Sequence, residues 1–320
     1  MNIKVIATIF VIAGLGCGAW LLMDRSVADK HGKAAYAHTE AILAFGPRTV
    51  ESEGLKKSQD YIAQELAKHG WNSILQSVER QTPNGKHTFT NLIARYQAEQ
   101  LSSIDDLKTM PTKGILCAHL DSKKIPGIPN FLGADDAASA CALIIELAAT
   151  LAKENPEMAK ELELVFYDGE EALGSNIIVP GHGNTPDYLT ADGLQGSRAY
   201  SIMLYDRKPK PKFGILLDMV GHKNLDIAVP SDSPPHLYES MLRAAEKHGQ
   251  KRRFNMADGT ILDDHYYMNK AGVPTIDIIG NFSGSHWWHQ EGDNIDLISA
   301  KSLTISYHVV LEMLREQLAK

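Results

Sequence analysis

The chain has 320 residues, of which 44% are hydrophobic and 22% are charged, and its formal net charge is −7 at pH 7. This is the composition of a globular protein, long enough for one large α/β domain or two small ones. A mildly acidic chain lacks the net positive charge that attracts the phosphates of nucleic acid, so we expect no nucleic-acid partner.

The first element in chain order is an uncharged apolar run over residues 5–23. Its length suits a membrane-spanning helix and is generous for a cleaved signal peptide, although "SVA" at 26–28 has the small residues of a cleavage site. Lipid attachment at Cys17 is the weakest interpretation, because Gly14 stands where such sites prefer leucine. We therefore expect residues 1–29 to be a membrane anchor or signal segment. Either one places the rest of the chain outside the cytoplasm, with the periplasm as the expected compartment, and limits membrane contact to this segment.

From residue 30 onward, helical and strand patterns alternate, with no internal repeat and no long low-complexity linker. Apolar residues recur at helical spacing in some segments, and other segments alternate or are short apolar runs typical of strands. Helices are predicted at 34–46, 52–70, 135–154, 196–206, 234–249 and 299–320, and strands at 72–82, 87–97, 113–122, 162–168, 213–221 and 274–280. Interleaved strands and helices predict a single α/β domain over 30–320, a three-layer α/β/α sandwich around a mixed, mostly parallel sheet.

Polar side chains recur where the predicted strands end, and in such sheets ligands bind beyond the carboxyl ends of the strands. Each group alone has an ordinary structural explanation, such as a solvated turn, a helix cap or a hydrogen-bonded histidine. Their recurrence favours a shared site, and a mixed set of carboxylates and imidazoles suits Zn²⁺. The groups are His119 and Asp121, Glu170 and Glu171, Asp218, the run Asp263–His265, and His289 in a Trp-rich loop.

Six short motifs follow one another along the chain: "AHLDS", "GADDA", "DGEEA", "LLDMVG", "DDH" and "WWH". In this order they resemble the zinc aminopeptidases and their relatives, the glutaminyl cyclases, from about Phe45 to the C-terminus. The resemblance implies that Asp136, Glu171 and His289 bind one zinc ion and that Glu170 is the catalytic acid and base.

Two further positions leave the chemistry open within this superfamily. His119 and Asp218 match the aminopeptidases' ligands for a second zinc, with Asp136 bridging the two metals. The cyclases retain equivalent residues and bind a single zinc. The resemblance therefore implies one zinc per chain in a cyclase and two in an aminopeptidase.

Four features resemble the cyclases more closely than the aminopeptidases. Lys123 follows the shared "HLDS", Ala137 follows the bridging aspartate, Asp263 precedes Asp-His, and Trp288 directly precedes the ligand histidine. We therefore expect an enzyme that cyclises the N-terminal glutamine of peptides or proteins to pyroglutamate and releases ammonia.

The resemblance also implies roles in this reaction. Zinc would polarise the side-chain carbonyl, and Glu170 would move a proton from the amine to the departing ammonia. Asp218 and Asp263 would share a hydrogen-bond network with Glu170. Trp288 would form an apolar wall of the pocket, although core packing explains a single tryptophan equally well.

The chain also departs from the animal cyclases. No tryptophan follows shortly after Glu171, and Asp277 stands where those enzymes have histidine, either as a substrate-binding residue or as a simple buried acid. Cys141 matches one partner of their disulfide, but Cys117 is one residue out of register with the other, so we expect no disulfide. The family also implies a cis peptide bond at 136–137.

Two alternatives remain. A dinuclear zinc aminopeptidase would use His119 and Asp218 for its second metal and Glu170 to activate a bridging water. A membrane-tethered binding domain would have kept the fold and lost the metal, but the complete set of candidate ligands argues against it.

Overall fold

The computed structural model describes residues 28–320, so the apolar run at 5–23 lies outside the described part of the chain. The prediction of an anchor or signal segment therefore concerns residues that are not described. Within 28–320, none of the helices has both the length and the apolar character that crossing a membrane requires.

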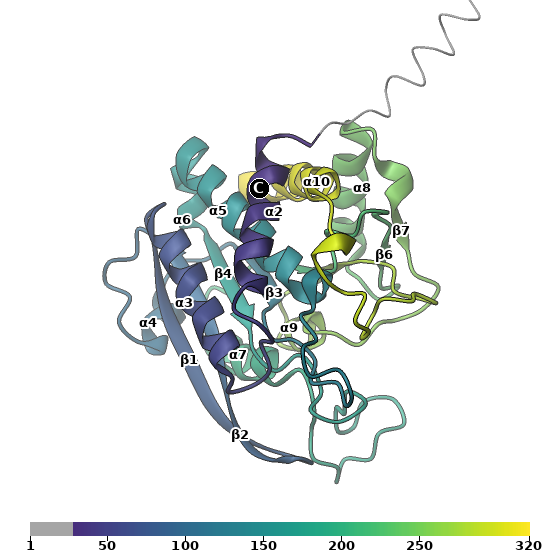
Figure 1. Ribbon diagram of the computed structural model, residues 1–320. Helices are drawn as coiled ribbons and strands as arrows, with labels where there is room; N and C mark the ends of the chain where they lie inside the picture. Colours follow the sequence, from purple (N-terminus) through teal and green to yellow (C-terminus); the bar gives the residue numbers. More distant parts are fainter. Residues whose placement is uncertain (1–27) are drawn as a thin grey trace, which may run out of the picture.

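Six strands form the central sheet: β1 (Trp71–Thr82), β2 (Gly85–Tyr96), β3 (Gly114–His119), β4 (Leu162–Tyr167), β5 (Phe213–Asp218) and β8 (Thr275–Ile279). Their order is β1-β2-β4-β3-β5-β8, and Figure 1 labels β1, β2, β3 and β4 among them. β2 runs antiparallel to both of its neighbours, whereas β4, β3, β5 and β8 are parallel. A separate small sheet pairs β6 (Ile227–Val229) with β7 (Phe254–Met256). The main sheet is mixed and mostly parallel, which confirms the prediction.

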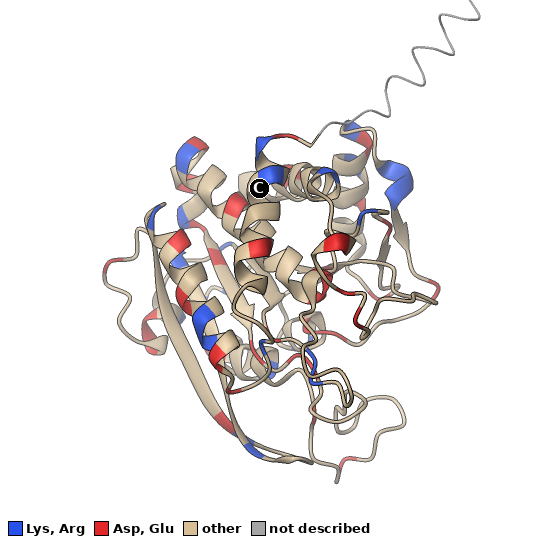
Figure 2. Ribbon diagram, in the orientation of Figure 1, with Lys and Arg blue, Asp and Glu red and all other residues tan. Residues whose placement is uncertain are grey.

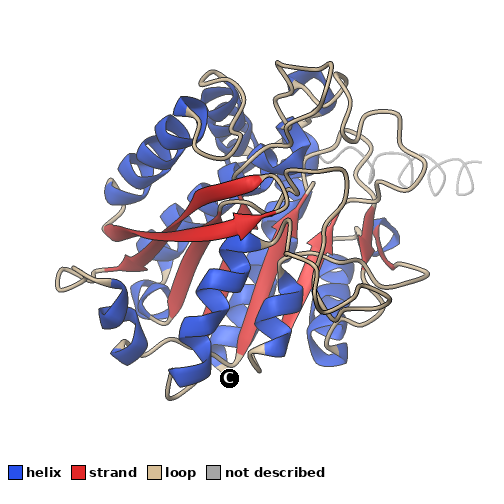
Figure 3. Cartoon of the chain, turned by 90° about the horizontal axis from the view of Figure 1, so that it is seen from below, coloured by secondary structure: helices blue, strands red, loops and turns tan. Residues whose placement is uncertain are grey.

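Helices cover both faces of this sheet (Figure 3). One face packs against α2 (Lys30–Leu43), α3 (Glu53–Ala67), α5 (Ala140–Glu154), α6 (Pro156–Lys160), α8 (Pro235–Lys247) and α10 (Ala300–Ala319). The other packs against α4 (Ile104–Thr109), α7 (Gln195–Asp206) and α9 (His265–Lys270). Successive residues of a strand contribute their side chains to the two cores alternately, because side chains point to opposite faces along a strand. The predicted three-layer α/β/α fold is confirmed.

Acidic and basic residues stand close together along helices such as α3, which is typical of solvated helices (Figure 2). On α3, for example, Glu53, Lys56 and Asp60 are all exposed. The acids and bases at the strand ends are different, because most of them are buried.

The two cysteines of the described chain are both buried and both free. Cys117 belongs to the core on the α7 side of the sheet, whereas Cys141 belongs to the core on the α5 side. The shift of one residue in β3 thus points the Cys117 thiol away from Cys141, as the sequence analysis predicts.

The start of the predicted 135–154 helix is not an ordinary helical turn. Residues Ala134–Ser139 form a π-type segment with non-helical backbone angles at Asp136 and Ala137, and the peptide bond between these two residues is cis, as the family resemblance implies. α5 begins after this segment without a side-chain cap. Asp135 and Asp136 thus lie in this π-type segment, ahead of α5 and not in its first turn.

The sequence pattern does not predict five of the elements, namely α4, α6, α9, β6 and β7. They contain between three and six residues. Segments of this length are too short to show a hydrophobic period. The longer elements lie where the pattern places them, to within a few residues at their ends.

A buried ionic cluster fixes the end of the sheet opposite the strand carboxyl ends. Glu163 of β4 is fully buried and faces Arg207, with Oε1–Nη1 and Oε2–Nη2 distances of 2.9 and 3.0 Å. Arg95 approaches Oε2 to 3.3 Å, and the hydroxyl of Tyr200 donates to Oε1. Paired and hydrogen-bonded in this way, the charges are tolerated in the core.

Candidate metal site and active site

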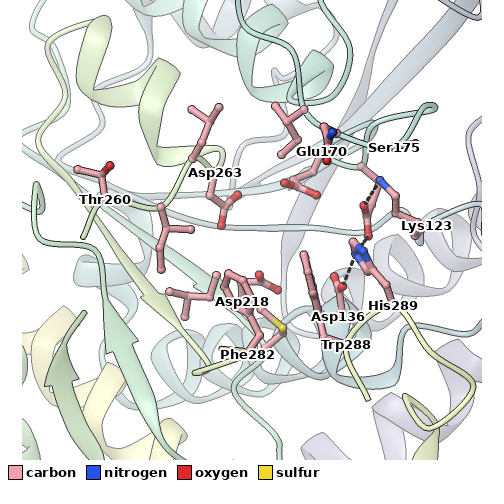
Figure 4. Close-up of a pocket in the computed structure, with 17 residues that line it drawn as sticks. Lys123, Asp136, Glu170, Ser175, Asp218, Thr260, Asp263, Phe282, Trp288 and His289 are labelled. Atoms are coloured by element: carbon pink, nitrogen blue, oxygen red, sulfur yellow. Dashed lines mark hydrogen bonds and ion pairs between the residues drawn. The ribbon is translucent and has the colours of Figure 1, made fainter. Parts of the chain in front are cut away.

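The carboxyl ends of the parallel strands bring most of the predicted site residues together. His119 ends β3, Asp218 ends β5, and Glu170 and Glu171 follow β4 after a short turn. These ends surround a cavity of about 390 Å³ (Figure 4). Its lining includes Lys123, Asp136, Glu170, Glu171, Asp218, Asp263, Phe282, Trp288 and His289.

Asp136, Glu171 and His289 form one compact group of candidate ligands. His289 Nε2 lies 3.3 Å from Asp136 Oδ2 and 3.1 Å from Glu171 Oε1, and the three donor atoms are all within 4.8 Å of one another. Both carboxylates are buried, and His289 is partly buried in its loop. Two carboxylates and one imidazole match the donors of a catalytic zinc site and leave room for a further ligand. The residues therefore fit the metal that the resemblance implies.

Lys123 holds the outer oxygen of one candidate ligand. Its ammonium lies 3.1 Å from Glu171 Oε2 and donates to the main-chain carbonyl of Ala172 at 2.9 Å. The other oxygen of Glu171 faces His289. A cation behind a ligand carboxylate fixes its orientation, as partners of metal ligands commonly do.

His119 lies beside this group and faces two carboxylates. Its Nε2 is 3.1 Å from Asp136 Oδ1 and 3.4 Å from Asp218 Oδ1, and its Nδ1 is 3.1 Å from the carbonyl oxygen of Asp121. Burial opposes the charged imidazole, but hydrogen bonds to Asp121, Asp136 and Asp218 raise the pKa of His119 well above its usual value. This group could hold a second cation, or it could serve as a charged histidine between carboxylates, so the geometry keeps both stoichiometries open.

Glu170 and Glu171 diverge although they are adjacent. Asp121 accepts the amide of Glu170 at its Oδ1 and the amide of Glu171 at its Oδ2, both at 3.2 Å. Both side chains line the cavity, but only Glu171 belongs to the candidate metal group. Burial, together with the nearby charge of Glu171, raises the pKa of Glu170 well above its usual value. A carboxyl group with a raised pKa can carry a proton near neutral pH, which suits an acid and base.

Further acids lie at the cavity and next to it. Asp218 lines the cavity, and burial raises its pKa to about 8. Asp263 also lines the cavity, and its carboxylate has an oxygen within 4.8 Å of ligand atoms of His265 and Asp277. Asp277 itself is fully buried, does not line the cavity, and lies with Oδ2 3.5 Å from His265 Nδ1. The structure therefore places Asp277 as a neighbour of Asp263 and offers no support for its predicted contact with substrate.

Aromatic rings form one wall of the cavity. The ring of Trp288 stacks on His289 with a centroid separation of 4.0 Å and an interplanar angle of 23°. Its centroid also lies 4.7 Å from that of Phe282. Trp288 keeps 37% of its surface exposed, so it is not a packed core residue. Its position fits the predicted pocket wall better than the core-packing alternative.

Several positioning acids were not identified from the sequence. Asp293 accepts the amides of Asp135 and Asp136 at 2.7 and 3.2 Å, and Asp135 Oδ1 accepts the amide of Gly221 at 2.7 Å. Asp168, which follows β4, is buried and accepts the amide of Thr90 at 2.7 Å. Among these positioning acids, the sequence indicates only Asp121 as a candidate, because Asp121 lies at the end of a predicted strand beside His119.

The comparisons with known proteins agree with this geometry. A model of Peptidase family M28 matches residues 91–314. The glutaminyl-peptide cyclotransferase of Dictyostelium discoideum is 28% identical over 84% of this chain and 80% of its own length. The glutaminyl cyclase of Porphyromonas gingivalis superposes with a TM-score of 0.73 at 26% identity, covering 89% of this chain and 98% of that one. A Zn-dependent exopeptidase from Parabacteroides distasonis reaches 0.71 at 26% identity, covering 90% and 99%. Fold similarity alone does not choose between these chemistries.

The charge on His289 predicts how metal affinity depends on pH. Burial opposes the charged ring, but Asp136 and Glu171 raise the pKa of His289 to about 9 in the metal-free protein. An imidazole binds a metal only through an unprotonated nitrogen, so zinc has to displace this proton. We expect zinc affinity to rise between pH 6 and pH 9, by up to about tenfold per pH unit for one displaced proton. Competition with a chromophoric chelator, itself calibrated at each pH, measures this. An affinity that stays constant across the range would contradict the assignment of His289.

Proposed function

The chain belongs to peptidase family M28, and within it we propose that the chain is a zinc-dependent glutaminyl-peptide cyclotransferase, which converts N-terminal glutamine to pyroglutamate and releases ammonia. The observation that carries this is the placement of Glu170. Its carboxyl group lines the cavity beside the candidate zinc ligands and has a raised pKa. Curated relatives, and several of the similar solved structures, are themselves glutaminyl cyclases.

The reaction joins two groups of one residue, so the site must fold the glutamine and move one proton. The α-amine attacks the side-chain amide carbon, a C–N bond forms, and the bond to the amide nitrogen breaks. Zinc, when bound by Asp136, Glu171 and His289, supplies a Lewis acid for the amide oxygen. Glu170 takes the proton from the attacking amine and delivers it to the departing ammonia.

The surrounding residues orient the reactants and Glu170. Asp218 and Asp263 line the cavity and carry raised pKa values, caused first by burial. Carboxyl groups that are this close share protons and can accept from the substrate amine as well as from one another. The wall of Trp288 and Phe282 limits the conformations of the glutamine side chain, which favours attack within one residue.

A dinuclear aminopeptidase is the second candidate, and one observation favours it. His119, Asp136 and Asp218 offer ligand atoms within 4.8 Å of one another, so they form a second possible metal group. We propose one zinc per chain, with His119 and Asp218 as hydrogen-bonding groups. The two proposals differ in metal content and in product.

The decisive experiment compares two assays on full-length protein purified without chelator. We expect ammonia release from a Gln-initiated peptide, little release of aniline from a leucyl anilide, and about one tightly bound zinc per chain by elemental analysis. Two tightly bound zinc ions with anilide hydrolysis would support the aminopeptidase instead. The same peptide with N-terminal Asn is the substrate control, because its shorter side chain would have to close a strained four-membered ring.

The two adjacent glutamates should respond differently to the same substitution. Glu170→Gln should lower kcat by about 10²–10⁴ and leave zinc bound, since it removes only the proton carrier. Glu171→Gln should lower zinc affinity itself, because a ligand carboxylate is lost. Zinc content and kcat are measured on both variants. Equal zinc loss in the two would contradict their separate roles.

We also propose that residues 1–29 place the enzyme outside the cytoplasm, as a membrane anchor or cleaved signal. The apolar run at 5–23 supports this. In a Gram-negative host the full chain should be found in the membrane or periplasmic fraction, and external protease should digest it in spheroplasts. Recovery in the cytosol, protected from protease, would rule this out.

A further inference from the structure

Arg48 is a buried cation close to the candidate metal group, and no catalytic step described above uses it. It lies between α2 and α3 and is fully buried. Its guanidinium donates to three main-chain carbonyls: Nε to Leu120 at 2.8 Å, Nη1 to Leu132 at 2.6 Å and Nη2 to Gly133 at 2.9 Å. Each of the three nitrogens therefore has a main-chain acceptor.

These carbonyls belong to the two segments that carry candidate ligands. Leu120 stands between His119 and Asp121, just beyond the end of β3. Gly133 opens the segment that leads to Asp136, and it has a positive φ of 56°. A Cβ at Gly133 would lie 2.0 Å from the carbonyl oxygen of Asp136, so this segment is folded tightly back on itself.

The main chain of Arg48 adds a second link to the first of these segments. Its amide donates to Ser122 Oγ at 2.9 Å, and its carbonyl accepts from the Ser122 amide at 3.1 Å. The segment after β3 is thus bound to Arg48 through Leu120 and Ser122. The planar guanidinium, with several donors in a fixed arrangement, can reach both segments at once, which a lysine ammonium does less well.

The charge of Arg48 also matches its surroundings. Burial lowers the pKa of Arg48, while Cys141 and three acids, Asp293, Asp121 and Asp136, act in the opposite direction. Burying a guanidinium is costly unless its donors are satisfied and opposite charge is near. Both conditions hold for Arg48.

We propose that Arg48 is a positioning residue for the metal site, which holds the end of β3 and the 132–133 segment at the separation that lets His119 and Asp136 face each other. This rests on the proposed zinc-dependent function only in requiring that zinc binds at Asp136, Glu171 and His289. Arg48 contacts neither zinc nor substrate, and its effect passes through the two main-chain segments.

The test is the zinc affinity of Arg48→Lys, which keeps the charge and loses the planar set of donors. We expect affinity, measured by chelator competition, to fall by about 10–100-fold, the usual loss when a partner of a metal ligand is removed. At saturating zinc, kcat on the Gln-initiated peptide should fall with little change in KM, because the cavity wall is untouched.

Arg207→Lys is the matched control. Arg207 is also buried, but it binds Glu163 at the opposite end of the sheet. This variant should lower the melting temperature of the metal-free protein and leave zinc affinity unchanged. If Arg48→Lys behaves in the same way, losing stability and keeping zinc affinity, then Arg48 is merely structural and the proposal is overturned.

Ser122→Ala decides the matter if Arg48→Lys fails to fold. It removes only the hydroxyl that accepts the Arg48 amide, so the chain should fold, and zinc affinity should fall by a few-fold. Unchanged affinity in a folded Ser122→Ala protein would then overturn the proposal.

Zinc affinity does not depend on the reaction catalysed. A protein without cyclase activity whose zinc affinity still falls on substitution would support the Arg48 inference and reject only the proposed function.

Discussion

Buried carboxylates that accept hydrogen bonds from main-chain amides hold the candidate site together. Asp121 binds the amides of Glu170 and Glu171, and Asp293 binds those of Asp135 and Asp136. Each hydrogen bond to a charged group contributes about 1.5–3 kcal/mol, which offsets much of the entropy lost on fixing a loop residue. Each loop that carries a candidate ligand is thus held by a carboxylate from a different loop. The loss of one such carboxylate should therefore disturb residues that are far from it in sequence.

The use of buried carboxylates concentrates negative charge at the candidate site. The cations around the site balance part of this charge. Burial raises the pKa values of Asp218 and Glu170, and the charges of neighbouring carboxylates raise them further. Lys123 and Arg48 place positive charge around the group, and a bound divalent cation would add more. Metal binding and the stability of this region should therefore be linked, because zinc favours the folded arrangement that assembles its ligands.

Much of the fold follows from sequence periodicity, because the long elements repeat their apolar residues often enough to reveal the period. The site residues differ in how far the sequence predicts them. The ends of predicted strands indicate His119 and Asp218 as candidates, but assigning Asp136 or His289 as ligands required the order of several motifs. Asp293 and Arg48 could not be found this way, since they act through contacts across the fold that leave no local pattern. For Asp293 the contact spans 158 residues.

The difference between Glu170 and Glu171 shows how one main-chain constraint produces two chemical environments. With both amides fixed on Asp121, the adjacent side chains leave the backbone in different directions. One oxygen of Glu171 faces His289 and the other faces Lys123. Glu170 enters the cavity, where burial favours the protonated form. A carboxyl group with a raised pKa can carry a proton, whereas a carboxylate held between a histidine and a lysine is placed to bind a metal, so the two adjacent glutamates are suited to the separate roles proposed for them.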